Sequence, residues 1–484
     1  MRTKLPPLLS AILLAGCAVG PDYKTPPALV SHANGQNAFV RSGDAPVTVQ
    51  APAARWWESL NDPVLTGLVD KAISANPDAQ AAKARLRQAR SALGLEKANS
   101  APSVNAMAVY AHAHLPGVNL GGSDEGSQGS GGSDNGSTDL NLYNLAFDAS
   151  WEIDLFGGQR RKTEAARATA QAAEASLADV QVSLSAEVVQ AYVNLRDRQQ
   201  RMALNAASIT RQEQMLDLTR QRVERGTASG IEFSRLSTQL DGTRAQAVPL
   251  NAERDAYLDE LATLIGEEPG TLDAQLGVAA PLPLPPATVA IGDPAALLQR
   301  RPDIRAAERT LAADTAKIGA AEAARFPRLS FMGLIGIGGT SLSDLGHLDD
   351  FVALAAPQLS WNFLDFGRNR ARIGQAEAAR DEAEAKYRAT VLAALRDAEG
   401  SLSRFRYRRV EVATLARAKV SADEAARLST QRYTAGTSSL IDLLDAQRQQ
   451  IAAEQNLSVA QAGLTSDFIA IQKSLGLGWS GKPE

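Results

Sequence analysis

Cys17 is the only cysteine of the 484-residue chain, and its surroundings indicate what its thiol does. Arg2 and Lys4 precede an apolar run over 5–15, and small residues then lead to the cysteine in Leu-Ala-Gly-Cys. This order predicts a lipoprotein signal peptide over 1–16, cleavage before Cys17 and lipidation of the thiol. An ordinary signal peptide with an incidental cysteine is the alternative. A single cysteine also excludes an intrachain disulfide and a Cys-based zinc site.

Two other groupings imitate ligand-binding motifs. Residues 476–482 fit Gly-x-x-x-x-Gly-Lys, but Pro483 stands where a P-loop needs Ser or Thr, and no strand precedes the motif. His112 and His114 lie two apart, on one face of a strand, where an incidental pair is favoured over a metal site. The formal net charge of −4 gives no basic surface for nucleic acid. We therefore predict a protein that is not an enzyme and has no cofactor, metal or nucleic acid.

The elements that carry these residues are duplicated. The block 151–160 recurs 210 positions later, and at the same offset 221–231 recurs as 431–441. Earlier in each half, 77–102 matches 302–327 at an offset of 225. Two separate blocks that share one offset indicate an internal repeat.

The two offsets differ by 15 residues, and the difference falls at 121–137, a Gly/Ser/Asp-rich stretch that we expect to be an exposed loop. The predicted organisation is a first repeat over 17–280, a linker strap over 281–294 and a second repeat over 295–484. In each repeat the first segment that matches the other repeat is predicted to be a helix, at 76–98 or 302–324, and each helix stops before a proline.

Alternation of apolar and polar residues predicts a strand hairpin in each repeat, at about 103–151 and about 328–361. Beyond Cys17 no run approaches 18 apolar residues, so any membrane crossing must use these four strands of about ten residues. Four strands cannot close a barrel and free edges are not tolerated in lipid, so several chains must share one barrel. Three chains would give twelve strands, with Trp151 and Trp361 in an aromatic girdle at the membrane interface.

A long helix follows each strand hairpin. Residues 157–225 and 367–435 contain no proline and combine frequent Ala with alternating Glu and Arg, which favours coiled packing. Each would be roughly 100 Å long at 1.5 Å per residue. Return helices are expected at 231–264 and 440–475. A soluble coiled-coil rod is the alternative, but it explains neither the lipidation motif nor the amphipathic strands.

Taken together, these features resemble the outer-membrane efflux lipoproteins of the OprM/NodT branch of the TolC-like channels, over nearly the whole chain. The motifs that carry the resemblance are Leu14-Ala15-Gly16-Cys17, Gly20-Pro21-Asp22-Tyr23, Trp56-Trp57, 151–157, 298–304, 432–436 and 444–447.

The resemblance implies an α+β membrane protein in which a duplicated unit combines a β-hairpin with very long coiled helices. It also implies a trimer that forms a 12-strand β-barrel on a periplasmic α-helical barrel. N- and C-terminal equatorial segments and the strap would form a collar. Ala18, rather than Asp, after the cysteine implies release to the outer membrane.

A periplasmic gate is implied at Tyr433, Ile441 and Asp445, with Asp442 beside them. Ile441 and Asp445 lie four residues apart and so share a helix face. In a trimer Asp445 would form a ring of three carboxylates that attracts cations. At the 210-residue offset Asp445 aligns with Arg235. This leaves two readings open, an ion pair between repeats that closes the tip and a solvated helix face.

The function implied is a passive exit duct of a tripartite efflux pump, lipid-anchored and integral in the outer membrane, with a large periplasmic portion. Its partners would be a periplasmic adaptor and an inner-membrane transporter of the RND type or, alternatively, the MFS type. The adaptor would meet the turns after the long helices, at Gly226, Thr227, Ser229, Gly436, Thr437 and Ser439. The alternative function is the adaptor subunit itself, but an adaptor has one helical hairpin whereas this sequence predicts two.

Overall fold

The computed structural model describes residues 18–26, 39–41, 47–48, 50, 52–116, 137–292, 300–346, 349 and 351–479. Cys17, almost all of the predicted loop 121–137 and part of the linker strap lie outside these residues. The chain divides into two compact units, unit 1 with 1–24, 88–170 and 310–383, and unit 2 with 25–87, 171–309 and 384–484. Each unit therefore takes residues from both repeats, because the long helices pass from one unit into the other.

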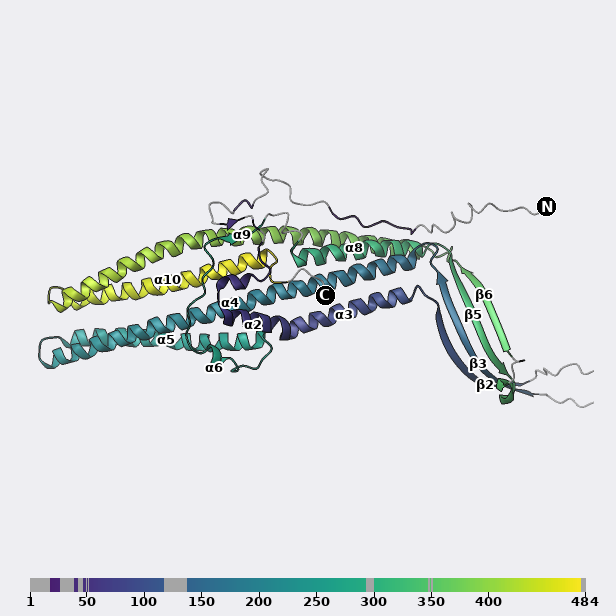
Figure 1. Ribbon diagram of the computed structural model, residues 1–484, viewed down its shortest axis with the longest axis horizontal. Helices are drawn as coiled ribbons and strands as arrows, with labels where there is room; N and C mark the ends of the chain where they lie inside the picture. The colour runs from purple at the N-terminus through teal and green to yellow at the C-terminus, as the bar shows by residue number, and fades with distance from the viewer. Residues whose placement is uncertain are drawn as a thin grey trace, which may run out of the picture. The chain divides into compact units, whose positions relative to one another are not determined.

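Unit 1 contains a four-stranded antiparallel sheet with the strand order β2-β3-β5-β6 (Figure 1). The strands are β2 Ser103–Pro116, β3 Ser137–Ile153, β5 Arg328–Gly339 and β6 Phe351–Ser360. β2 and β3 have 14 and 17 residues, more than the ten expected, because their pairing continues to Pro116 and Ser137, beyond the clearest alternation. Over the described residues, β2 and β6 are the two edges of the sheet.

The two strand hairpins share one register. Ser103 lies opposite Ser150 in the first hairpin, and Arg328 lies opposite Ser360 in the second. Arg328 follows Ser103 by 225 residues and Ser360 follows Ser150 by 210, which are the two offsets of the sequence repeat. The duplication is therefore a repeat of backbone pairing as well as of sequence.

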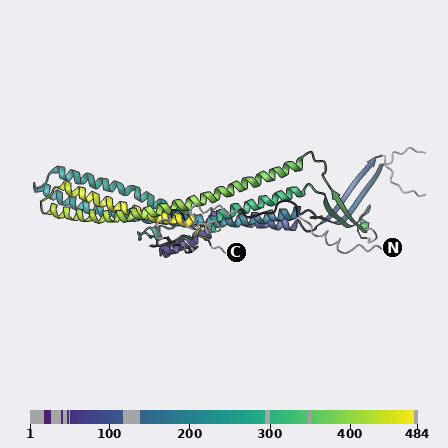
Figure 2. The ribbon, with the colours of Figure 1, turned by 90° about the horizontal axis from the view of Figure 1, so that it is seen from above.

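Two helical hairpins of equal dimensions follow the strands. The long helices α4 Gly158–Glu224 and α9 Arg368–Thr434 have 67 residues each. The return helices α5 Gly230–Leu264 and α10 Leu440–Ser474 have 35 each. Both ribbon views show each return helix alongside its long helix (Figures 1 and 2). Within the described part of the chain, no helix combines the length and the apolar character needed to cross a membrane.

The shorter helices that precede the strands are also equal in length. α3 Pro77–Ala98 and α8 Pro302–Ala323 have 22 residues each and begin with a proline, whose fixed φ suits the first helical position. The side chain of Asn76 accepts hydrogen bonds from the backbone N–H groups of Asp78 and Ala79 at 2.8 and 3.1 Å, and so caps α3.

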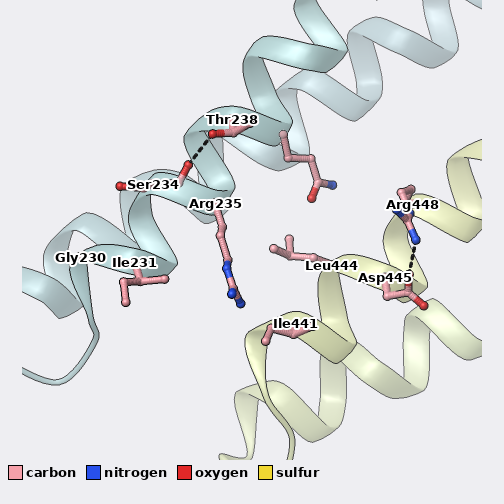
Figure 3. Close-up of a pocket in the computed structure, with 10 residues that line it drawn as sticks. Gly230, Ile231, Ser234, Arg235, Thr238, Ile441, Leu444, Asp445 and Arg448 are labelled. Carbon is pink, nitrogen blue, oxygen red and sulfur yellow. Dashed lines mark hydrogen bonds and ion pairs between the residues drawn. The ribbon is translucent and has the colours of Figure 1, made fainter.

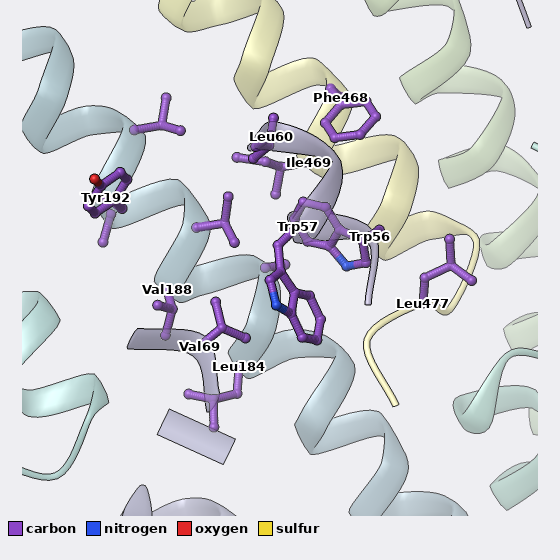
Figure 4. Close-up of a cluster of buried hydrophobic side chains, with 14 of the residues drawn as sticks. Trp56, Trp57, Leu60, Val69, Leu184, Val188, Tyr192, Phe468, Ile469 and Leu477 are labelled. Carbon is purple, nitrogen blue, oxygen red and sulfur yellow. The ribbon is translucent and has the colours of Figure 1, made fainter. Parts of the chain in front are cut away.

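The largest apolar cluster of unit 2 joins residues from near both ends of the sequence. The short helix η1 Trp56–Leu60 contributes Trp56 and Trp57, α2 Pro63–Ala75 contributes Leu65, and α10 contributes Phe468. Trp56 packs edge-on against both Trp57 and Phe468, with ring centroids 5.9 Å apart in each pair (Figure 4). Leu477 belongs to the same cluster. Burial of Phe468 alone contributes about 2 kcal/mol.

The strap between the repeats is ordered where it is described. The Pro283 carbonyl accepts a hydrogen bond from the Thr465 hydroxyl of α10 at 2.9 Å, and Leu282 packs against the apolar cluster. Beyond it, β4 Val289–Ala290 pairs in parallel with β1 Val47–Thr48. Sequence reasoning did not predict these strands, because two residues are too few to show alternation.

Arg161 of α4 holds the first described residues against unit 1. Its buried guanidinium donates to the carbonyls of Val19 and Gly20 at 3.2 and 3.1 Å, and to the Asp22 carboxylate at 2.7 Å. Gly20 has a φ of +91°, and a Cβ there would lie 2.3 Å from the Cα of Gly319 in α8. Only glycine therefore fits where this segment crosses α8.

Candidate functional site

The turns between long and return helices are built the same way in both repeats. A glycine with positive φ ends each long helix, and the N–H of the next residue, a threonine, donates to the carbonyl five residues before it, which closes the helix end. The first turn has Gly226 at +70° and a Thr227 to Arg222 bond of 2.8 Å; the second has Gly436 at +72° and a Thr437 to Arg432 bond of 2.9 Å.

A serine caps each return helix. The Ser229 hydroxyl accepts from the N–H of Glu232 at 3.3 Å, and the Ser439 hydroxyl accepts from the N–H of Asp442 at 3.2 Å. The Asp442 carboxylate accepts in return from the Ser439 N–H at 3.1 Å. Its hydrogen bonds from the Ser439 hydroxyl and backbone lower the pKa of Asp442. Asp442 thus serves as a helix cap, which the Ser-x-x-Asp spacing could have indicated.

A small apolar cluster joins the two helical hairpins near their turns. Its buried members are Leu236 of α5 and Leu440, Leu443 and Leu444 of α10, with Met215, Leu216 and Tyr433 packed against them. All four helices of the two hairpins contribute to it. The predicted gate residue Tyr433 therefore lies in the contact between the hairpins.

Tyr433 also makes a polar bond across this contact. Its hydroxyl accepts from the Arg222 guanidinium of α4 at 2.8 Å, and the guanidinium lies 5.4 Å from the ring centroid. Sequence reasoning identified Tyr433 but not this partner. Arg222 has an arginine counterpart in the other repeat, Arg432, so nothing in the sequence distinguishes Arg222. Tyr433, in contrast, has Val223 as its counterpart.

The other predicted gate residues surround an open groove of about 730 Å³ between α5 and α10 (Figure 3). Arg235 extends into it from α5, while Ile441 and Asp445 line the α10 side. The Asp445 carboxylate accepts from Arg448 at 2.6 Å and from Gln449 at 2.7 Å, both on its own helix. Within the described chain, Arg235 makes no ion pair. The carboxylate is thus paired within α10 rather than with Arg235.

The two predicted girdle tryptophans occupy equivalent positions at the ends of β3 and β6. The Trp151 indole N–H donates to the Ser100 carbonyl at 3.1 Å, and the Trp361 indole N–H donates to the Arg325 carbonyl at 3.0 Å. Ser100 and Arg325 are related by the 225-residue offset. The two residues are 39% and 55% exposed, so each combines an anchored polar edge with an exposed apolar surface.

The histidine pair lies on β2, where His112 Nδ1 is 2.9 Å from the Asn141 side-chain oxygen of β3. Among the residues that the structure describes, no group of three or more His, Cys, Asp or Glu side chains is arranged to hold a metal ion. The site is therefore a set of turns, an apolar contact and a charged groove, which can hold helices together or release them.

Comparisons with known proteins agree with this architecture. The family model described as "Outer membrane efflux protein" matches residues 68–267 and 294–477. Nodulation protein T of Rhizobium leguminosarum bv. trifolii is 30% identical over 97% of this chain and 96% of its own length. Outer membrane protein OprJ of Pseudomonas aeruginosa is 29% identical over 98% of this chain and 95% of its own.

Among solved structures, the outer-membrane channel OprN is similar with a TM-score of 0.85 and 34% identity, over 96% of this chain and all of that one. The expected fold of strand hairpins and long coiled helices is confirmed. The chain belongs to the outer membrane efflux protein family, and it is an outer-membrane channel of an efflux pump, with a periplasmic helical portion and no enzymatic activity.

Proposed function

We propose that three copies of this chain form a passive exit duct for drugs or other small molecules, with a gate at the helical hairpin turns. The four-stranded sheet carries this proposal. One of its faces is apolar, with Leu145, Phe147 and Leu359 all more than half exposed, and over the described residues both edges lack a partner. Lipid does not tolerate unpaired edges, and three copies would supply twelve strands.

The proposal includes a lipid anchor at Cys17. The segment that follows is fixed to the foot of the sheet, since the Val19 N–H donates to the Phe156 carbonyl at 3.1 Å and Arg161 holds the next carbonyls. Phe156 lies three residues after the end of β3. This geometry supports an acylated residue close to the membrane end of the strands.

The partners proposed are a periplasmic adaptor and an inner-membrane transporter, of the RND type or alternatively the MFS type. OprJ-like relatives include proteins named as efflux pump outer membrane components. The adaptor would meet the two turns around Gly226 and Gly436. In both turns the hydroxyls of the threonine and of the capping serine make hydrogen bonds within the turn, so an adaptor would contact an ordered surface.

The gate is proposed to be closed at rest by two sets of contacts. Leu236, Leu443 and the Arg222 to Tyr433 bond hold the hairpins of one copy together. The second set lies in the groove between α5 and α10, where each copy contributes the guanidiniums of Arg235 and Arg448 and the carboxylate of Asp445. There the carboxylate would offset the charge of the two guanidiniums. Removing that carboxylate would leave like charges facing each other, which favours opening.

The test is the resting conductance of the purified full chain in planar bilayers. Asp445→Ala should raise resting conductance and shift selectivity toward anions. Arg448→Gln is the matched control, because it frees the carboxylate for Arg235 and should not raise conductance. Ile441→Ala should leak for steric reasons in either case. Unchanged or lower conductance in Asp445→Ala, with loss of cation preference, would reduce Asp445 to a selectivity residue.

The oligomer is tested separately by native mass spectrometry of the detergent-solubilised chain. Three copies are expected. A stable monomer in detergents that preserve the folded strands would remove the shared duct from the proposal.

A further inference from the structure

A small pocket lies at the foot of the sheet in unit 1, where the strands meet the helices. It is bounded by the starts of α4 and α9, the end of α8 and the ends of β3 and β5 that adjoin them. Its volume is about 270 Å³, below the range of about 300–1,000 Å³ that is usual for drug-sized ligands. The pocket therefore suits a small solute better than a drug.

Both repeats contribute equivalent residues to this pocket. Lys162 near the start of α4 and Arg372 near the start of α9 both line it, and they are 210 positions apart. Gln159 and Asn369 line it as well and are related by the same offset. The duplication thus places two basic and two amide side chains around one space.

Three basic side chains line the pocket, those of Lys162, Arg328 and Arg372. Within the part of the chain that the structure describes, none of the three forms an ion pair. Arg372 makes one long hydrogen bond, to the side-chain oxygen of Asn369 at 3.5 Å. Their charges are therefore available to a ligand.

Acidic side chains balance these charges only in part. Asp154 caps α4, because it accepts from the N–H groups of Gln159 and Arg160 at 3.1 and 2.8 Å, and it also lies 3.4 Å from the Arg160 guanidinium. Among the described residues that line the pocket, Glu152 is the one remaining carboxylate. Its counterpart in the second repeat is Asn362, which is neutral. Three cations therefore face one carboxylate that has no other role.

The strand ends show on which face of the sheet the pocket lies. Glu152 follows Trp151 in β3, so the two side chains point to opposite faces. Ser330 of β5 lies opposite Glu152, and Arg328, two residues before Ser330, is on the same face as Glu152. Trp151 is on the apolar face that would meet lipid. The pocket is on the other face, which would line the duct.

We propose that this pocket binds a small multivalent oxyanion, such as a phosphate group, and forms a site for anionic solutes on the wall of the duct. Guanidinium groups match phosphate oxygens in geometry and can donate to two of them at once. An anion of two or more charges would gain more than chloride from three cations. The inference rests on the proposed duct for the side that the pocket faces, whereas binding itself can be measured on any folded chain.

Isothermal titration calorimetry of the full chain in a neutral detergent, at low and constant ionic strength, measures this binding with inorganic pyrophosphate as the probe. Pyrophosphate should bind saturably. Lys162→Gln together with Arg372→Gln should weaken binding at least about ten-fold, because two charge-assisted contacts are lost. Glu152→Gln should instead strengthen binding about three-fold, because it removes the opposing carboxylate.

A second double variant provides the matched control. Arg167 of α4 and Arg388 of α9 are exposed and do not line the pocket. Arg167→Gln together with Arg388→Gln removes the same charge from the same two helices, and should change the affinity by less than about two-fold because solvent and salt screen these side chains. Hydrogen exchange should locate the site, since pyrophosphate should slow exchange at 152–162 and 320–328 in the wild-type chain.

A soluble phosphate compound and a lipid headgroup share the chemistry that this pocket recognises. Its place on the face away from lipid favours the soluble compound. Dihexanoyl phosphatidylglycerol, added below its micelle concentration, separates the two sources. It should bind more weakly than pyrophosphate, and tighter binding of the lipid would overturn the assignment to a soluble solute.

The outcomes also separate this inference from the proposed duct. An absence of saturable pyrophosphate binding to the wild-type chain overturns the site. Equal weakening in the two double variants also overturns it, because it would show a general attraction to a charged surface. If native mass spectrometry finds a monomer that still binds pyrophosphate, the proposed duct fails and the anion site stands.

Discussion

The two helical hairpins share their backbone but differ in the residues between their helices. Both have a 67-residue and a 35-residue helix, a positive-φ glycine and a serine cap. In α4, however, Asn205, Gln212 and Thr219 are buried at intervals of seven, where α9 has Leu415, Ala422 and Ser429. Duplication has thus kept the residues that shape the backbone and changed those that set how tightly the helices hold together.

The salt bridges between the paired helices also differ between the two hairpins. In the first hairpin Glu213 of α4 pairs directly with Arg244 of α5 at 2.6 Å. The equivalent residues of the second hairpin are both acidic, Asp423 and Glu454. Lys419 of α9 bridges them, 2.6 Å from the first and 3.8 Å from the second. The same place in the fold is held by two different charge patterns.

The largest difference between the hairpins should appear on truncation of Leu443. It is fully buried in the cluster near the turns, whereas its counterpart Phe233 is only half-buried. Leu443→Ala should reduce the free energy of local opening by about 3 kcal/mol, and Phe233→Ala by about 1 kcal/mol, since less area is lost. Hydrogen exchange of the turn amides measures both. Equal losses would mean that the two hairpins are held equally.

Substitution of the two turn glycines should destabilise the two hairpins equally. Gly226→Ala and Gly436→Ala should each cost about 1–2 kcal/mol, because both backbones lie in the left-handed region. A Cβ would meet no atom within 4 Å at either position, so strain in φ is the whole effect. The same exchange measurement applies, and a difference above about 1 kcal/mol would contradict the equivalence of the two turns.

The smallest effect is expected for Lys419→Met. The pair is partly exposed, so its loss should cost about 0.5 kcal/mol near neutral pH. Hydrogen bonds from Lys419 and then Gln450 lower the pKa of Asp423. This stabilisation is therefore present above the unfolded pKa of the carboxyl and is lost as pH falls through the lower folded value.

In Lys419→Met, the stability that hydrogen exchange reports for the second helical hairpin should therefore change less as the pH is lowered into the acidic range. Ile209→Val, at the equivalent position of the first hairpin, is the neutral control. An unchanged pH dependence in Lys419→Met would show that Gln450 alone sets the charge state of Asp423.

Sequence reasoning located the elements well because their ends carry strong local signals. The first long helix, expected at 157–225, runs from Gly158 to Glu224, and the second, expected at 367–435, runs from Arg368 to Thr434. Glycine and proline mark such ends directly. Strand lengths were harder to predict. β2 continues beyond the stretch in which apolar and polar residues alternate clearly, because its pairing with β3 continues to Pro116.

The site was only partly predictable. Periodicity places Ile441 and Asp445 on one face, and the groove indeed contains both together with Arg235. The bond between Arg222 and Tyr433 joins residues 211 positions apart, and no local pattern reports such a contact. Asp442 also caps α10, and the Ser-x-x-Asp spacing that indicates this cap is a local signal.

The buried Arg161 has a consequence for the order in which the chain folds. The Val19 carbonyl that it holds and the next residue, Gly20, both lie against Gly319 of α8, so the earliest described residues pack on a helix from the second repeat. Contacts between such distant parts of a chain form late, because the loop that joins them must first be closed. The segment after Cys17 is therefore synthesised early and takes its final place only after α8 has been made.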